Sequence, residues 1–228
     1  MIAPTGIVDE TATWFRDGNN WTGDGGVPIR LFEHLAYSAL TIGIAVAIAI
    51  PVGLWIGHTG RLRGLAVVFT GAMRALPTLG LLTLVVLITG IGLTAPILAL
   101  VVLAIPPVLA GAYSGLEAVD RQTIDAARAM GMTEWQILGR VEVPLALPLL
   151  VGGVRSAVLQ VVATATVAAF VSLGGLGRYI IDGQRNNDYP EMVAGSILVI
   201  ALALVLDVVF VGFQKIAQGG RAPALSTT

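Results

Sequence analysis

Three charged side chains lie inside long apolar stretches of this sequence: Arg74, Arg155 and Asp207. A charge at membrane depth is costly, so such a residue usually faces a bundle interior or a partner of opposite charge. The sequence therefore predicts an ion pair between Asp207 and either Arg155 or Arg74. The arginine without a partner is expected to extend its side chain to the interface between lipid and water.

Residues that could catalyse a reaction or bind a metal are few. An intramembrane enzyme needs a nucleophile with a base, or paired acids, at one depth. Asp207 is the only acid well inside an apolar stretch, and no base stands near the candidate serines in sequence: Ser38, Ser156 and Ser196. His34 and His58 lie near opposite ends of one stretch, which indicates interface residues. No catalytic residue and no metal site is predicted.

The chain also lacks the pattern for binding nucleotide phosphates. It contains a single lysine, Lys215, and no glycine-rich loop precedes it, which excludes a P-loop. Residues 172–177 (SLGGLG) are glycine-rich, but no Lys-Ser/Thr pair follows them. They are interpreted as a turn or a gate segment, with Gly174, Gly175 and Gly177 as gate candidates, and a plain flexible turn is the alternative.

The composition indicates that membrane helices position these residues. Of 228 residues, 56% are apolar and 12% are charged, against about 25% charged in soluble domains. The net charge of −1 suggests no nucleic-acid partner, and the absence of cysteine excludes disulfides. No signal-peptide pattern is visible in residues 1–30. The chain is predicted to be an all-α membrane protein.

Five apolar stretches are long enough to span, because about 20 helical residues cross the hydrocarbon core. They cover residues 35–57, 66–88, 95–112, 147–171 and 192–213. We therefore expect a segment outside the membrane at 1–34, a transmembrane domain at 35–213 and a tail at 214–228. Prolines interrupt the stretches and are expected to kink them, and Pro77 with Gly80 is the candidate for a pore-lining break.

The distribution of basic residues predicts the orientation. With an odd number of spans, the two termini lie on opposite sides. If the amino terminus is outside, the inner segments carry seven basic residues and the outer segments four, which matches the bias of cytoplasmic loops toward Lys and Arg. The loop at 117–148 and the tail are then cytoplasmic.

That loop carries signals for two short helices. Asp120 is a plausible N-cap for a helix over residues 121–130, and Gly131 fits the left-handed position that ends it. Thr133 with Gln136 makes a capping box for a second helix. Pro144 and Pro148 are expected to mark its end and a turn into the fourth span.

The first loop helix has a surface of small residues, with Ala126, Ala127 and Ala129 close together. Such a surface would let a groove of another protein approach the backbone, and Asp125 could pair locally with Arg121 or Arg128. An amphipathic helix lying on lipid headgroups is the alternative. It is disfavoured because those helices have bulky apolar residues on one face and basic residues on the other.

These residues resemble the cytoplasmic coupling loop of binding-protein-dependent ABC importer permeases. The matching features are residues 125–127 (DAA), Gly131 and the ending at 143–148 (VPLALP), with Asp125 where the family has glutamate. The resemblance implies that the loop binds a cytoplasmic ATPase, which supplies ATP binding. The residues assigned to coupling are Asp125, Ala126, Ala127, Met130, Gly131, Met132, Glu134, Pro144 and Pro148.

Further segments are similar to the osmoprotectant permeases within that family: residues 75–80 (ALPTLG), 113–116 (YSGL), 152–155 (GGVR) and 173–177 (LGGLG). The implied activity is uptake of glycine betaine, choline, carnitine or proline across a bacterial cell membrane. The implied partners are the ATPase, a second identical or homologous permease, an external binding protein and membrane lipid. A methionine-type permease is the nearest alternative, and a scaffold subunit without transport is another.

Overall fold

The computed structural model describes residues 4–171 and 174–219, which form helices and their connections. No strand occurs within these two ranges. In chain order the structure contains α1 (Pro4–Arg16), a 3-10 turn (Gly18–Trp21), α2 (Val27–Thr59), α3 (Arg63–Arg74), α4 (Thr78–Thr89), α5 (Thr94–Glu117), α6 (Arg121–Ala129), α7 (Glu134–Ile137), a π-helix (Leu138–Glu142), α8 (Val143–Thr164), a 3-10 helix (Ala165–Val171), α9 (Gly177–Asn186) and α10 (Tyr189–Gly219).

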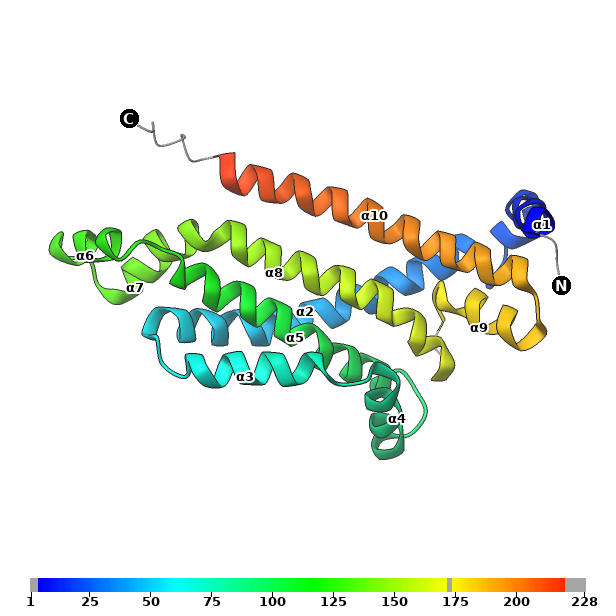
Figure 1. The fold of residues 1–228 in the computed structure, drawn as a ribbon, viewed down its shortest axis with the longest axis horizontal. Coiled ribbons are helices and arrows are strands. Elements are labelled where there is room, and N and C mark those ends of the chain that lie inside the picture. Colours follow the sequence, from blue (N-terminus) through cyan, green and yellow to red (C-terminus); the bar gives the residue numbers. More distant parts are fainter. Residues whose placement is uncertain (1–3, 172–173, 220–228) are drawn as a thin grey trace.

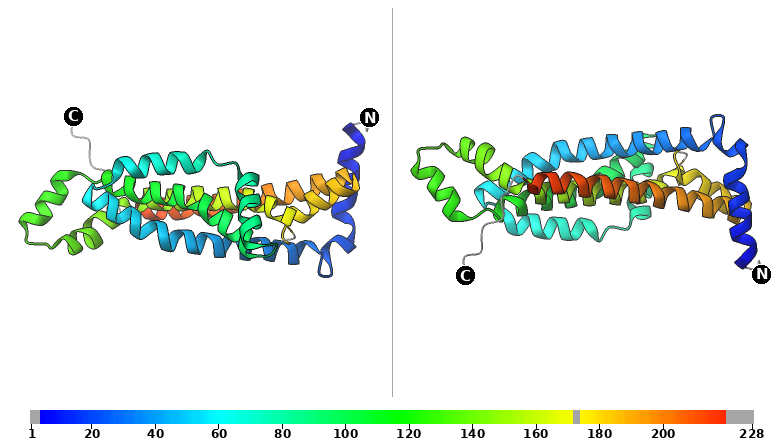
Figure 2. Two further views of the ribbon diagram at one scale, coloured as in Figure 1. Left: turned by 90° about the horizontal axis from the view of Figure 1, so that it is seen from below. Right: turned by 90° about the horizontal axis from the view of Figure 1, so that it is seen from above.

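The long helices α2, α5, α8 and α10 run side by side along one axis, and α3 runs beside them while α4 bends away from α3 (Figure 1). The remaining short helices lie at the two ends (Figure 1). The helices α6 and α7 extend from one end, together with the carboxyl ends of α2 and α10. At the other end α9 lies beside the starts of α2 and α10, and α1 crosses the bundle axis (Figure 2). We call these the loop end and the far end.

Four helical runs of the described residues are long and apolar enough to cross a membrane: α2, α5, the run Glu134–Val171 and α10. A fifth span exists if α3 and α4 count as one, although they bend by 91° at their junction. Pro77 caps α4 with an extended backbone (ψ 121°), and the residue before a proline disfavours the α conformation. The second predicted span is therefore a sharply broken element and no kinked continuous helix.

Small residues bring the central helix α5 close to its neighbours. A Cβ atom at Gly53 of α2 would lie 2.5 Å from the Ala112 Cβ of α5, and one at Gly111 of α5 would lie 2.6 Å from the Gly153 Cα of α8. Close backbone approach through small residues is how membrane helices associate, because lipid gives little hydrophobic drive between them. The helices α2, α5 and α8 are thus one tightly packed unit.

Two boundaries and two short helices differ from the sequence prediction. The helix α2 begins at Val27, so the expected division at residues 34/35 falls inside it. The fourth span changes from α-helix to 3-10 helix at Ala165. Two short helices at the far end, α1 and α9, were not predicted, because each is too short and too polar for the apolar pattern to show it.

Candidate functional site

The helix α6 begins and ends as the sequence predicts. The Asp120 carboxylate accepts a hydrogen bond from the backbone N–H of Gln122 at 3.0 Å. Gly131 adopts φ +84° after the last turn, and its N–H donates to the Arg128 carbonyl at 2.9 Å. A Cβ at Gly131 would meet nothing within 4 Å, so the left-handed backbone and not the available space requires glycine here.

The predicted capping box is also present, but the predicted turn after it is not. The Thr133 N–H donates to the Gln136 side chain at 2.9 Å, and the Thr133 hydroxyl accepts from the Gln136 N–H. The chain then continues without a turn through the π-helix into α8. Pro144 follows the π-helix directly, where the backbone bonding pattern already changes, and Pro148 lies inside α8. The prediction that these prolines end a helix is wrong.

A small apolar core holds the loop together. Val119, Ile124, Ala127 and Ile137 are buried in it, and Met132 packs against them. Ala127 is only 2% exposed, so it cannot belong to a smooth face offered to a partner. Ala126 is exposed, as the prediction required.

Two large apolar side chains stand at the surface of the loop instead. Met130 is 77% exposed and Trp135 is 83% exposed. Asp125 and Ala126 are exposed on α6. We call these four residues the docking tip. Trp135 is not among the coupling residues predicted from the sequence, although a tryptophan in a charged loop between spans is itself a signal of a contact surface.

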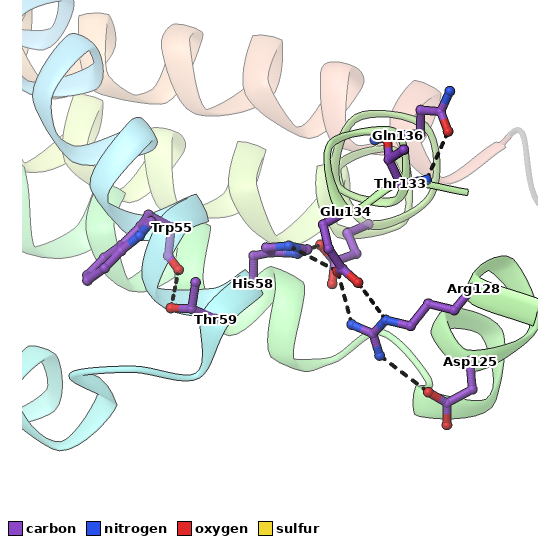
Figure 3. A network of polar contacts seen from close by, with 9 residues as sticks. Trp55, His58, Thr59, Asp125, Arg128, Thr133, Glu134 and Gln136 are labelled. Carbon is purple, nitrogen blue, oxygen red and sulfur yellow. Dashed lines mark hydrogen bonds and ion pairs between the residues drawn. The ribbon is translucent and has the colours of Figure 1, made fainter. Parts of the chain in front are cut away.

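Polar side chains tie α6 and α7 to each other and to α2 (Figure 3). Arg128 donates to both Glu134 oxygens at 2.8 and 3.0 Å and lies 3.4 Å from Asp125. The hydrogen bond with Glu134 raises the pKa of Arg128, so the guanidinium stays charged. His58, at the end of α2, completes the group with Nε2 at 3.4 Å from the Glu134 carboxylate.

His58 also reaches the π-helix. Its Nδ1 lies 2.5 Å from the carboxylate of Glu142, which is only 3% exposed. A buried carboxylate depends on such a partner, because leaving it unpaired is costly. His58 lies in the last turn of α2 and links this helix to the loop, a contact that the prediction of an interface residue did not include. Neither His58 nor Glu142 is among the site residues predicted from the sequence, since 84 residues separate them.

The glycine-rich segment at the far end is held in place by α2. The N–H of Gly175, which has φ +82°, donates to the Glu33 carboxylate at 2.8 Å. Arg30 donates to the same carboxylate at 3.0 Å. A Cβ at Gly174 would collide with Glu33, and one at Gly177 would collide with the Thr166 carbonyl. These contacts disfavour the flexible-turn interpretation for 174–177, and residues 172 and 173 lie outside the described range.

His34 lies beside this segment and is buried. Its Nε2 is 3.0 Å from the carbonyl of Val162 on α8, and its ring would be 3.2 Å from a Cβ at Gly175. The prediction of an interface residue did not include this burial against α8. The start of α2 thus contacts both the glycine segment and the fourth span.

Among the intramembrane charges, the structure joins Arg155 to Asp207. The guanidinium of Arg155 donates to both carboxylate oxygens at 2.7 and 2.9 Å, and also to the side chain of Gln214 at 2.9 Å. Arg74 is exposed at the end of α3, and no ion pair of Arg74 occurs in the described part of the chain. Gln214 was not predicted.

The pore candidates Pro77 and Gly80 lie at the bend between α3 and α4. A Cβ at Gly80 would be 3.1 Å from the Pro77 ring, so the start of α4 leaves little room for a side chain. Neighbouring residues of α4, Thr78 and Leu82, line a small cavity with residues of α5 and the 3-10 helix at Ala165–Val171. The bend therefore packs against α5 and the 3-10 helix at the end of the fourth span.

A bundle of membrane-spanning helices with an ordered polar loop at one end has the form of a transport permease. The family described as binding-protein-dependent transport system inner membrane component matches residues 49–220. The chain belongs to this family of ABC importer permeases. It is accordingly a multi-pass inner membrane protein and no enzyme, and such importers include an ATPase and a binding protein.

Individual relatives are similar over most of their length. The carnitine transport permease protein OpuCD of Listeria monocytogenes is 34% identical over 180 residues, which is 78% of this chain and 81% of OpuCD. The glycine betaine/carnitine/choline transport system permease protein OpuCB of Bacillus subtilis is 29% identical and covers 82% of this chain and 87% of OpuCB. The osmoprotectant import permease protein OsmW of Salmonella typhimurium is 32% identical, over 77% of this chain and 84% of OsmW.

A solved structure has the same fold. A chain of the MetNI methionine ABC transporter, in an inward-facing conformation, aligns with a TM-score of 0.72 and 25% identity. The alignment covers 82% of this chain and 93% of that one.

Proposed function

We propose that this chain is the permease subunit of an importer for small osmoprotectants of the glycine betaine, carnitine and choline class. The observation that carries the proposal is its similarity to OpuCD, OpuCB and OsmW across more than three quarters of each chain. Their names describe permeases for carnitine, glycine betaine, choline and osmoprotectants. Proline remains a further candidate of similar size.

A methionine permease is the second candidate, because the aligned structure belongs to a methionine transporter. Both are tested by deleting the gene and measuring uptake of radiolabelled glycine betaine, carnitine, choline, proline and methionine at high salt. Loss of the uptake of one osmoprotectant, and its restoration by the wild-type gene, supports the proposal. Normal osmoprotectant uptake with loss of methionine uptake would move the assignment to the second candidate.

The docking tip is the proposed contact with the ATPase. Met130 and Trp135 expose apolar surface over an ordered core, which is the arrangement found at the anchors of protein interfaces. Asp125 and Ala126 lie beside them, and the Arg128–Glu134 pair fixes α6 against α7. ATP is bound by the partner, since this chain has no P-loop.

The loop end is proposed to be cytoplasmic and the far end external. The basic-residue bias supports this orientation, and it places α1, α9 and segment 174–177 where an external binding protein would deliver its substrate. The variants Thr133→Cys and Thr22→Cys test it, because the chain has no native cysteine and both positions are exposed. An impermeant thiol reagent added outside should label residue 22 alone; labelling of residue 133 alone would reverse the orientation.

A second permease subunit is proposed to complete the pathway. One copy has at most five spans, and α10 leaves apolar side chains such as Leu204 and Val208 exposed along much of its length. Lipid and a second subunit together would cover this surface. Cross-linking of single-cysteine variants followed by mass analysis shows whether the partner is a second copy or another chain.

A further inference from the structure

Both ends of α2 form polar contacts with segments that are distant in sequence. His58 contacts Glu134 and Glu142 at the loop end, and Glu33 contacts the N–H of Gly175 at the far end. Glu33 and His58 are 25 residues apart, which in an α-helix corresponds to about 38 Å. One helix therefore connects the loop that carries the docking tip to segment 174–177 across the length of the bundle.

The middle of α2 packs closely against α5 through small residues. A Cβ at Gly53 would lie 2.5 Å from the Ala112 side chain, and one at Gly57 would lie 2.8 Å from that of Leu116. Ala45, Ala49 and Ile56 are buried in the same contact, on both sides of Pro51. A displacement of one end of α2 is consequently carried along the α2–α5 pair as a unit.

The contact at the loop end resists separation. Glu142 is almost fully buried, and opening its contact with His58 would leave a carboxylate without that partner. When the loop moves, His58 must follow it. At the far end, Gly174 and Gly175 closely approach Glu33 and His34, so α2 and the glycine segment are in direct contact.

We propose that α2 acts as a strut that carries movement of the loop to segment 174–177. His58 and Glu142 are positioning residues at one end, and Glu33 is the positioning residue at the other. The proposal rests on the proposed function in one respect, because it takes the ATPase as the source of the loop's movement. It assigns a role in transport to contacts at the two ends of α2.

The test measures movement at the far end in the complex with the ATPase, reconstituted in lipid vesicles. A spin label at Gln184→Cys reports on α9, because Gln184 is exposed there and the chain has no native cysteine. Spectra are compared without nucleotide and after trapping with ATP and vanadate. No transported substrate is needed, so an incorrect substrate assignment does not affect the result.

The contact is removed by the double variant His58→Leu/Glu142→Leu, which replaces both polar partners and leaves no buried charge unpaired. Thr59→Ala is the matched control, since Thr59 bonds only to the backbone of its own region, at Trp55 and Arg61. The double variant should still bind the ATPase and hydrolyse ATP. Its nucleotide-dependent change at residue 184 should fall about five-fold or more, the lower end of usual coupling between sites, while Thr59→Ala resembles wild type.

The other end provides an independent check. Glu33→Ala should give the same loss as the double variant, and combining the two should add little, because both interrupt one strut. Additive losses, or a wild-type response in the folded and ATPase-bound double variant, would overturn the proposal. Failure of the wild-type chain to bind an ATPase at all would instead refute the proposed function.

Discussion

Glycine serves different purposes at the two ends of this bundle. At the loop end Gly131 has open space around it and is required only for its left-handed backbone. At the far end Gly177 is required because a side chain there would collide with the Thr166 backbone, and a Cβ at Gly174 would displace the Glu33 carboxylate. The first arrangement shapes an exposed turn and leaves its surface available to a partner, whereas the second closes a packed joint inside one chain.

The packed joint at the far end is tested by a substitution at Gly177. Gly177→Val should destabilise the subunit by about 3 kcal/mol, the upper part of the usual range for overpacking, because the new side chain meets the Thr166 backbone. Thermal unfolding in detergent measures the loss. Gly212→Ala on α10, where a Cβ meets nothing within 4 Å, is the control. Equal stability of Gly177→Val and wild type would contradict the packed joint.

A substitution in the docking tip at the loop end should weaken ATPase binding and leave the stability of the permease unchanged. Trp135→Ala removes the most exposed anchor of the docking tip and should weaken ATPase binding by about 2 kcal/mol, the level of an interface hot spot. Unfolding of the isolated permease should be unchanged, because Trp135 is 83% exposed. Titration of the ATPase in detergent measures the affinity. An unchanged affinity would show that the tip lies outside the contact.

Substitutions at Gly131 separate the effect of its left-handed backbone from the effect of the space around it. Gly131→Val should destabilise the loop by about 1–2 kcal/mol, the cost of a left-handed backbone for a residue with a side chain. Gly131→Asn should cost less, because asparagine tolerates that conformation. ATPase binding and hydrogen exchange in α6 and α7 report the effect. If asparagine and valine are equally damaging, space and not backbone conformation limits this position.

The intramembrane charges give the smallest expected effect. Asp207→Asn alone leaves Arg155 with a weaker partner, and the double variant with Arg155→Gln should recover part of the loss. Assembly in the membrane and thermal unfolding, compared as a double-mutant cycle, measure this coupling. Arg74→Gln, at a residue exposed at the end of α3, is the control. Additive effects of the Arg155 and Asp207 changes would mean that the pair does not stabilise the subunit.

Local sequence signals predicted local structure well. Asp120, Gly131 and the Thr133–Gln136 box each act within a few residues, and each is found as predicted. The places of four spans were also predictable, since length and hydropathy determine them, whereas the second stretch is a pair of helices bent by 91°. The family resemblance followed from the same short segments and is confirmed by the match to residues 49–220.

Contacts between distant residues were not readable in the same way. The link from His58 to Glu142 joins residues 84 apart, and the link from Glu33 to Gly175 joins residues 142 apart. Ala127 was misplaced because a run of alanines does not show which one faces the loop's own core. The prolines at 144 and 148 were misread since a π-helix can carry the chain past such signals.

The π-helix at Leu138–Glu142 lets the chain carry one additional residue between the docking tip and the fourth span. A π turn accommodates one residue more than an α turn, whereas an additional residue in a regular α-helix would turn the chain by about 100°. The wide turn takes up this residue locally, so the helical run from α7 into α8 continues past it without that rotation. The direction in which Met130 and Trp135 face relative to α8 is thus kept although the segment is one residue longer than a regular turn.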